Sequence, residues 1–324
     1  MAHELRPPAF VAPAWLRNPH AQTVYASVFA PAPHPPFRRE RWDTPDGDFV
    51  DVDFVEGPPA APWLHLFHGL EGSSRSPYAR MLMHFAQVRG WRGSVFHFRG
   101  CSGELNRLPR AYHSGDSDEA DWALRRIKAL AGSAPMYAVG VSLGGNVLAK
   151  WLGERGESAA AVVEAAAAVC APLDLAAAAD ALERGLTRMY AHHFLRTLKR
   201  TALGKLQRFP DLFEAHAVRR STTLRQFDDV FTARLHGFRD AHDYYTRGSA
   251  KPVLPGIAVP TLILNARDDP FMPERALPTE REVASVVKLE FPSHGGHVGF
   301  VTAPFPGRIE WLAQRLLHFF EYRQ

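Results

Sequence analysis

The stretch YAVGVSLGGNVLAKWLGE contains one serine, Ser142, which stands between glycines in the order Gly140-Val141-Ser142-Leu143-Gly144. A serine hydroxyl is a poor nucleophile until a base takes its proton, and that base in turn needs an acid to orient it. Glycines two residues before and after the serine would permit a tight strand-to-helix turn, where any side chain would clash with its surroundings. The same pattern also arises by chance where a serine only caps a helix. Partners elsewhere in the chain must therefore decide between a nucleophile and a cap.

Candidate partners follow the serine in two loops, each after a short apolar segment. Asp268 and Asp269 lie in TLILNARDDPFMP, and His294 and His297 lie in EFPSHGGHVGF. An acid and then a histidine after the serine is the chain order of hydrolases whose nucleophile stands on a strand–turn–helix elbow. Loops at the carboxyl ends of parallel strands meet at one edge of the sheet, where such proteins place their sites. The three segments together therefore favour a Ser–His–Asp arrangement over a simple cap.

One residue of each pair is the better candidate. His297 directly follows Gly295 and Gly296, which let the loop bring an imidazole close to the serine without a side-chain clash. Asp269 directly precedes a proline, whose ring favours extended backbone geometry for the residue before it. Asp268 is then a loop residue that hydrogen-bonds its own backbone, as aspartates in turns do. The alternative for His297 is that its ring only packs the loop.

An oxyanion that develops during attack by the serine needs backbone N–H donors. Leu143, directly after the serine at the start of a helix, is one predicted donor, and Leu70 in HGLEGSSRSPY is the other. His68 in the same segment is interpreted as a structural histidine that braces Gly69.

The elements that must position these residues alternate between strand and helix. We expect a β-hairpin over 38–57, with its turn at Asp46-Gly47, and a capping box formed by Asp116 and Glu119 at a helix start. The predicted strands lie within 62–69, 93–100, 135–141, 162–172, 259–266 and 286–300, and the predicted helices within 77–90, 117–132, 144–156 and 307–324. Such alternation is typical of a parallel sheet covered by helices on both faces.

Two regions depart from this alternation. Residues 1–38 are rich in proline and aromatic residues, so we expect an N-terminal arm without a regular sheet or a long helix. Residues 174–252 have a helical period and are predicted to form a helical cap between the core parts 39–173 and 253–324. Between Asp174 and Arg225 ten Lys/Arg outnumber five Asp/Glu, so this segment holds the whole excess of the net charge of +4. Its basic face favours anionic substrates or a transient contact with a membrane surface, and the alternative is an ordinary solvated helix face.

Composition and the spacing of key residues argue against several classes of function. With 46% hydrophobic and 22% charged residues among 324, the chain is globular, and no basic run with interleaved aromatics suggests nucleic-acid binding. The two cysteines have no disulfide or zinc spacing, and neither histidine pair (His65 with His68, His294 with His297) has a third metal ligand at a familiar distance. No phosphate-binding or dinucleotide motif occurs, so we expect no cofactor. No apolar run resembles a signal peptide or a membrane span, which predicts a cytoplasmic protein.

Several motifs are similar to those of a known family. They are WLRNPHAQT, HGLEGSSRSPYAR, FRGCSGELNRLPRAYHSGDSDE, GVSLGGN, LRQFDDVFTARLHGFRDAHDYY, LNARDDPF and GGHVGF. With them the chain resembles the α/β-hydrolase superfamily, and within it the YheT-like branch (AB hydrolase family four). The resemblance implies the α/β-hydrolase fold, with an eight-stranded, mostly parallel sheet and a helical cap. It also implies a triad of Ser142, Asp269 and His297.

The function that follows from these residues is a cofactor-free serine hydrolase that cleaves a small-molecule acyl ester, a carboxylic ester hydrolase. Two alternatives stay open at this point. An acyltransferase would use the same triad and pass the acyl group to an alcohol. A ligand-binding protein would use the hydrolase scaffold without its chemistry.

Overall fold

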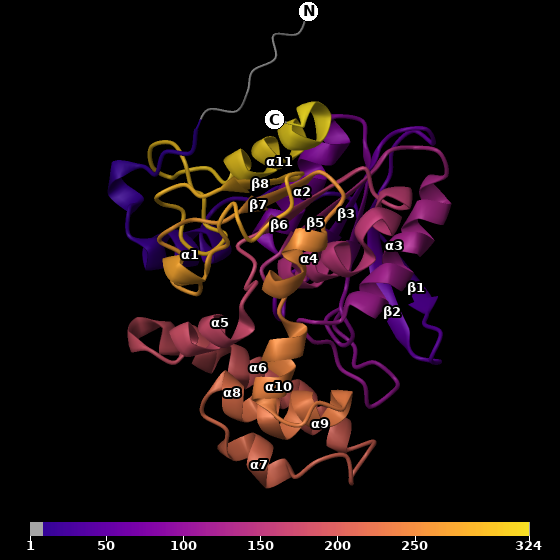
Figure 1. Cartoon of the computed structure of the whole chain (residues 1–324), viewed down its shortest axis with the longest axis vertical. Helices are drawn as coiled ribbons and strands as arrows, with labels where there is room; N and C mark the ends of the chain where they lie inside the picture. Colours follow the sequence, from indigo (N-terminus) through magenta and orange to yellow (C-terminus); the bar gives the residue numbers. More distant parts are fainter. Residues whose placement is uncertain (1–8, 324) are drawn as a thin grey trace, which may run out of the picture.

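An eight-stranded sheet runs through the centre of the molecule in the computed structural model, which describes residues 9–323 (Figure 1). The strands are β1 (Arg38–Asp43), β2 (Phe49–Val55), β3 (Trp63–Phe67), β4 (Arg92–Phe96), β5 (Met136–Val141), β6 (Ala165–Val169), β7 (Thr261–Leu264) and β8 (Val287–Glu290). They lie side by side in the order β1-β2-β4-β3-β5-β6-β7-β8. β1 and β2 pair antiparallel, as do β2 and β4, and all other neighbours are parallel. The predicted fold, a mostly parallel eight-stranded sheet, is therefore confirmed.

Helices cover both faces of this sheet. The α-helices are α1 (Pro19–Val28), α2 (Pro77–Val88), α3 (Ser117–Ala131), α4 (Leu143–Arg155), α5 (Leu175–Leu182), α6 (Arg188–Leu206), α7 (Ala215–Arg220), α8 (Leu224–Phe227), α9 (Ala233–His236), α10 (Ala241–Gly248) and α11 (Glu310–Tyr322). Shorter turns are η1 (Ala14–Leu16), η2 (Gly156–Ala161), η3 (Gly185–Thr187), η4 (Asp228–Thr232), η5 (Lys251–Gly256) and η6 (Glu274–Ala276). Helices α3 and α4 pack in one hydrophobic cluster, and α2 and α11 pack in another.

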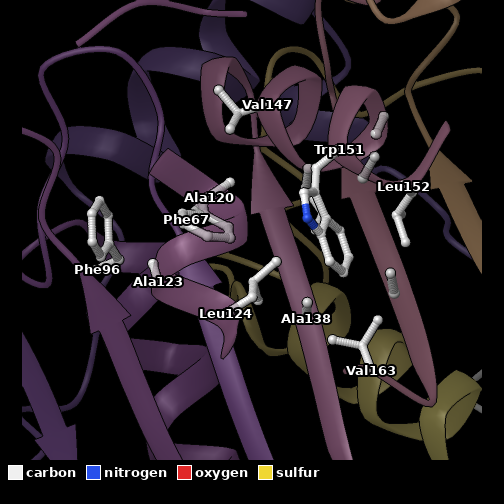
Figure 2. Close-up of a cluster of buried hydrophobic side chains, with 14 of the residues drawn as sticks. Phe67, Phe96, Ala120, Ala123, Leu124, Ala138, Val147, Trp151, Leu152 and Val163 are labelled. Carbon is white, nitrogen blue, oxygen red and sulfur yellow. The ribbon is translucent and has the colours of Figure 1, made fainter. Parts of the chain in front are cut away.

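The central strands are buried on both faces because they lie between these two helix layers. All six residues of β5 are buried, and alternate ones belong to the two clusters, with Ala138 in the first and Val139 in the second. Figure 2 shows part of the first cluster, in which Trp151 of α4 and Leu124 of α3 lie over the strands near Ala138. This packing holds the two ends of the β5–α4 connection, and Ser142 lies between them.

A helical segment interrupts the alternation between β6 and β7. It contains α5 to α10 and η5, and in Figure 1 these helices group together on the opposite side of the molecule from α11. We refer to residues 175–256 as the helical insertion. The division of the chain at 173/174 and 252/253 into core and cap domains stays a prediction.

The structure contains one short helix that was not predicted, and it contradicts one local expectation. The N-terminal arm, whose residues 1–8 lie outside the described part, contains a ten-residue helix, α1. Its start is stabilised by Asn18, whose side chain accepts a hydrogen bond from the backbone N–H of Ala21, and by a proline in the first turn. At the start of α3 there is no side-chain cap. Asp116 and Glu119 instead accept hydrogen bonds from Arg110 and Arg99, because charged partners from other segments bind carboxylates more strongly than a helix N-terminus does.

Candidate active site

Ser142 occupies a strained turn between β5 and α4. Its φ of 52° and ψ of −121° are unusual for a residue with a side chain, and its backbone N–H donates to the carbonyl of Val169 at 2.8 Å. A Cβ at Gly140 would lie 2.2 Å from the carbonyl oxygen of Gly144. A Cβ at Gly144 would lie 2.4 Å from the carbonyl oxygen of Phe67 in β3. Both glycines are therefore required by close backbone approach, as the sequence pattern predicts.

The structure brings Ser142, His297 and Asp269 into one hydrogen-bonded chain. Nε2 of His297 lies 2.9 Å from Oγ of Ser142, and Nδ1 of the same ring lies 2.9 Å from Oδ2 of Asp269. The Asp269 side chain is fully buried and that of His297 is 9% exposed. An imidazole held in this way can take a proton from the hydroxyl while the carboxylate fixes its tautomer.

The two neighbouring candidates, Asp268 and His294, lie beside this chain and contact each other. Oδ2 of Asp268 is 3.1 Å from Nδ1 of His294, and Oδ1 accepts the backbone N–H of Gly296 at 2.9 Å. The expectation that Asp268 would hydrogen-bond its own backbone was wrong. Its carboxylate binds the histidine loop instead, because that loop brings unpaired donors within reach.

Asp269 is held by its own loop. Its Oδ1 accepts the backbone N–H of Phe271 at 2.8 Å, which leaves Oδ2 for the histidine. The Phe271 ring stacks on the imidazole of His297, with centroids 4.2 Å apart and planes 27° apart. The acid loop therefore fixes both the carboxylate and one face of the imidazole.

Helix α1 holds the histidine loop from the other side. Oγ1 of Thr23 accepts the backbone N–H of His297 at 2.9 Å. The fully buried Gln22 donates to the carbonyls of Leu16 and Val301 and accepts the N–H of Val301 at 2.8 Å. These positioning residues were missed by motif reasoning, although the family motif WLRNPHAQT ends with both of them. The Asn-Pro pair in that motif is also the signal that could have predicted α1.

The predicted oxyanion donors, Leu70 and Leu143, flank the serine. A Cβ built at Gly69 would lie 3.1 Å from Cβ of Ser142, so the loop after β3 adjoins the elbow. Within the described residues, neither the Leu70 nor the Leu143 backbone N–H donates a hydrogen bond to another group. Leu143 is the first residue of α4, where N–H groups lack helical partners and the helix dipole favours negative charge.

The loop that carries Leu70 is fixed by a tyrosine and a histidine. The N–H of Gly69 donates to the hydroxyl of Tyr78 at 2.8 Å. Nδ1 of the buried His68 donates to the carbonyl of Gly69 at 2.7 Å, and its Nε2 accepts the N–H of Phe98 at 3.2 Å. Burial lowers the pKa of His68 to about 3, so the ring stays neutral and keeps this donor–acceptor arrangement. His68 is thus a structural histidine, as interpreted from the sequence.

A cavity of about 460 Å³ lies over Ser142, between the core and the helical insertion. Core residues that line it include Gly69, Leu70, Tyr112, Ser142, Leu143 and His297. Residues of the insertion that line it include Leu175, Leu182, Phe194, Leu198, Phe227 and Phe231. The wall supplied by the insertion is largely apolar, which suits a hydrophobic group bound next to the serine.

Cys170, Asp269 and His297 could also be considered as a metal site, because their candidate ligand atoms lie within 4.8 Å of one another. A metal there would have to displace the hydrogen bond between Asp269 and His297. Burial beside the Asp269 carboxylate raises the pKa of the Cys170 thiol well above its usual value, which disfavours the thiolate that binds metals. The chemistry of these donors therefore favours the hydrogen-bonded triad.

The sheet, the serine elbow and the cavity define a class of protein. A family model described as the alpha/beta hydrolase fold matches residues 62–304, more than half of the chain, and the protein belongs to this family. Within it the protein is YheT-like. It is 44% identical to YheT of Escherichia coli, provisionally named an esterase, over 307 residues that cover 92% of this chain and 89% of that protein.

More distant relatives fit the same class. Phospholipase ABHD3 of Mus musculus is 29% identical over 308 residues, covering 92% of this chain and 74% of that protein. The solved structure of an esterase from Pyrococcus furiosus matches with a TM-score of 0.55 and 16% identity, covering 97% of this chain and 96% of that chain, and supports the fold. The protein is thus an α/β hydrolase of the esterase and lipase type.

Proposed function

We propose that the protein hydrolyses carboxylic esters through an acyl-enzyme on Ser142, with His297 as general base and acid and Asp269 as its orienting carboxylate. One observation carries this proposal: the chain of two 2.9 Å contacts that runs from Ser142 through His297 to the buried Asp269. A serine that only capped helix α4 would need neither the strained turn nor the imidazole.

The reaction follows from this geometry. Oγ of Ser142 attacks the ester carbonyl carbon while Nε2 of His297 takes the hydroxyl proton, and Asp269 stabilises the imidazolium that forms. The N–H groups of Leu70 and Leu143 donate to the oxyanion. His297 then gives its proton to the departing alkoxide, and the ester C–O bond breaks. Water, deprotonated by the same imidazole, attacks the acyl-enzyme, so the acid leaves and the serine is restored.

The helical insertion acts in this proposal as a cap. Its apolar side chains, such as Leu182 and Phe227, line the cavity next to the serine. They would hold the hydrophobic part of the ester and keep bulk water from the oxyanion, which strengthens the hydrogen bonds that stabilise it.

The test is the Ser142→Ala variant, assayed with p-nitrophenyl esters of increasing chain length. We expect a loss in kcat on the order of 10⁴-fold or more, because the three residues act as a unit. We also expect an unchanged unfolding curve and loss of labelling by a fluorophosphonate probe, which should label the wild-type protein. A folded Ser142→Ala variant with near-normal turnover would contradict the mechanism. A wild-type protein that neither turns over esters nor reacts with the probe would point to a non-catalytic scaffold.

A further inference from the structure

Helix α1 exposes large apolar side chains. Val24 and Val28 of this helix and Phe29, the residue directly after it, are 38%, 66% and 65% exposed. Val24 and Val28 are one helical turn apart and therefore share a face. Ser27 of the same helix is exposed to solvent and also lines the cavity over Ser142. The apolar face of α1 thus lies next to a place where the cavity meets solvent.

A second exposed apolar group adjoins the first from the helical insertion. Leu186 in η3 and Met189 in α6 are 65% and 68% exposed. Tyr190, the residue after Met189, stacks on His20 of α1 with ring centroids 5.8 Å apart, and Nδ1 of His20 lies 3.2 Å from the tyrosine hydroxyl. His20 is one helical turn before Val24. We call Val24, Val28, Phe29, Leu186 and Met189 the apolar rim.

Exposed basic side chains follow the rim along α6. Arg188, His192, Arg196 and Arg200 recur every four residues, and all four are exposed. Successive helical residues are about 100° apart, so these four and Met189 fall on the same half of the helix. We call Arg188, Arg196 and Arg200 the cation row.

The two segments that carry this surface contain no carboxylate of their own. Residues 184–210 contain no Asp or Glu, and neither do residues 9–39, which include α1. Between residues 9 and 323, no arginine of the cation row forms an ion pair. Cations without internal partners beside exposed apolar groups are the combination that an anionic lipid surface attracts.

We propose that the apolar rim and the cation row together form a docking surface for an anionic phospholipid bilayer. The rim side chains enter the boundary between headgroups and acyl chains, and the arginines bind the phosphates. The adjoining opening of the cavity then faces the membrane, so an ester dissolved in the bilayer can reach Ser142 with little exposure to water. This last step rests on the proposed ester hydrolysis, whereas docking itself does not.

The charge and the apolar groups together favour an anionic bilayer over a nucleic acid or a neutral lipid surface. A nucleic acid would use the arginines and leave the apolar rim exposed, and a neutral lipid surface would use the rim but gain no attraction from the arginines. None of the described helices is both long and apolar enough to cross a membrane. The proposed contact is therefore one with the bilayer surface.

The experiment is co-sedimentation of the full chain with vesicles of phosphatidylcholine, with and without phosphatidylglycerol. We expect binding to the vesicles that contain phosphatidylglycerol and much weaker binding to phosphatidylcholine alone. Replacing the cation row by glutamine (Arg188→Gln, Arg196→Gln, Arg200→Gln) should weaken partitioning by about a hundredfold, from about 1 kcal/mol per arginine near an anionic surface. Binding should also fall as salt rises, because exposed charges are screened.

Two further variants separate the parts of the surface. The rim variant Val28→Asn, Phe29→Asn, Met189→Gln should lose membrane binding while keeping the charge. A matched control replaces exposed arginines of α7 and α9, which lie away from α1 (Figure 1), and Arg219→Gln, Arg220→Gln, Arg234→Gln should bind like wild type.

The outcomes are distinct. Equal binding to both kinds of vesicle, an equal loss in the control variant, or normal binding by the rim variant would each overturn the proposal. Binding to a polyanion such as heparin with no binding to vesicles would overturn it as well. Because docking needs no chemistry, the Ser142→Ala protein should bind vesicles as wild type does, which separates failure of docking from failure of the proposed reaction.

Discussion

At the scale of single residues, the site contains two acid–histidine pairs that differ in what they touch. Asp269 and His297 form the buried pair whose imidazole reaches Ser142, whereas Asp268 and His294 form a more exposed pair beside it. Adjacent side chains in an extended segment point apart, so one loop can supply both acids to different places. Asp269 and His297 can move a proton, whereas Asp268 and His294 can hold the loop in place.

Substituting the two acids separately should distinguish these roles. In Asp269→Asn the side chain keeps its shape but favours the wrong imidazole tautomer, a change that costs about 10⁴-fold in kcat in the serine-protease example. We expect a loss of that order for Asp269→Asn and less than about tenfold for Asp268→Asn. Steady-state kinetics on a p-nitrophenyl ester, with folding checked by circular dichroism, make the measurement. A large loss confined to Asp268→Asn would move the acid by one residue.

The histidines allow a matched comparison. His297→Gln removes the base, so kcat should fall by about 10⁴-fold or more, with substrate binding little changed. His294→Gln loses only its contact with Asp268, and its kcat should stay within about tenfold of wild type. If His297→Gln lost stability but kept its turnover, the ring would be a packing residue and the general-base assignment would be wrong.

At the scale of elements, helix α1 is the unexpected support of the site. Its Thr23 and Gln22 bind the loop that carries His297, although nearly the whole sequence of the chain lies between them. Two of the loop glycines approach this helix so closely that a Cβ would meet its backbone, at 2.5 Å for Gly296 and 2.9 Å for Gly299. The N-terminal segment therefore belongs to the catalytic architecture in the proposed mechanism.

Removing the Thr23 hydroxyl tests that support. Thr23→Val keeps the shape but leaves the backbone N–H of His297 without its acceptor. An unsatisfied buried donor costs about 1–3 kcal/mol, and we expect kcat to fall by about tenfold or more with a small change in KM. Thr23→Ser retains an oxygen at this position and should restore most of the activity. Equal kcat values for the valine and serine variants would show that the hydroxyl does not position the imidazole.

The elements differ in how well the sequence predicts them. The strands from β3 to β7 are buried throughout, and short, mainly apolar runs bounded by loops predict them because burial on both faces favours apolar residues. Strand β8 lies at the edge of the sheet, and of its residues only Val287 is buried. Helix α1 was missed since the surrounding prolines outweighed the Asn18-Pro19 start signal. The predicted capping box at Asp116 is absent for a different reason: Arg110 and Arg99 precede the carboxylates that they bind by six and 20 residues, and the capping-box pattern does not include them. Likewise, the order of the motifs along the chain predicts a triad of Ser142, Asp269 and His297. Thr23 and Tyr78, in contrast, act through contacts that only the folded chain forms.

At the scale of the whole molecule, buried polar contacts attach the helical insertion to the core. Asn146 of α4, one turn after the serine, donates to the carbonyls of Ser114 and Gly248 and accepts the N–H of Ala250. Lys205 of α6 is buried and donates to the Asn106 side chain at 2.6 Å, and burial lowers its pKa to about 8. Buried polar groups are costly when unpaired, so these contacts favour one position of the insertion over the site.

Inside the insertion, Asp228 should make global stability depend on pH. Its carboxylate accepts hydrogen bonds from Thr232 and Tyr245, and burial raises its pKa to about 6 from an ordinary value of 3.8. The folded protein therefore holds this proton more tightly than the unfolded chain does. The stabilisation is present at pH values below the ordinary pKa and is lost as pH rises towards the folded-state pKa. Asn has no such proton, so the free energy of unfolding of wild type relative to Asp228→Asn should fall by about 1 kcal/mol between about pH 5 and about pH 7.5.

Denaturant unfolding of both proteins at the two pH values measures this difference. Leu224→Ala, which removes apolar contacts from the same insertion but no titratable group, serves as control, and its difference from wild type should not change with pH. The direction in which the stability difference changes with pH distinguishes two cases, because an aspartate stabilised mainly by ion pairs would make the wild type relatively more stable as pH rises. A constant difference for Asp228→Asn, or one that grows in favour of wild type at the higher pH, would mean that Asp228 is ionised in the folded protein and that its hydroxyl partners outweigh the cost of burial.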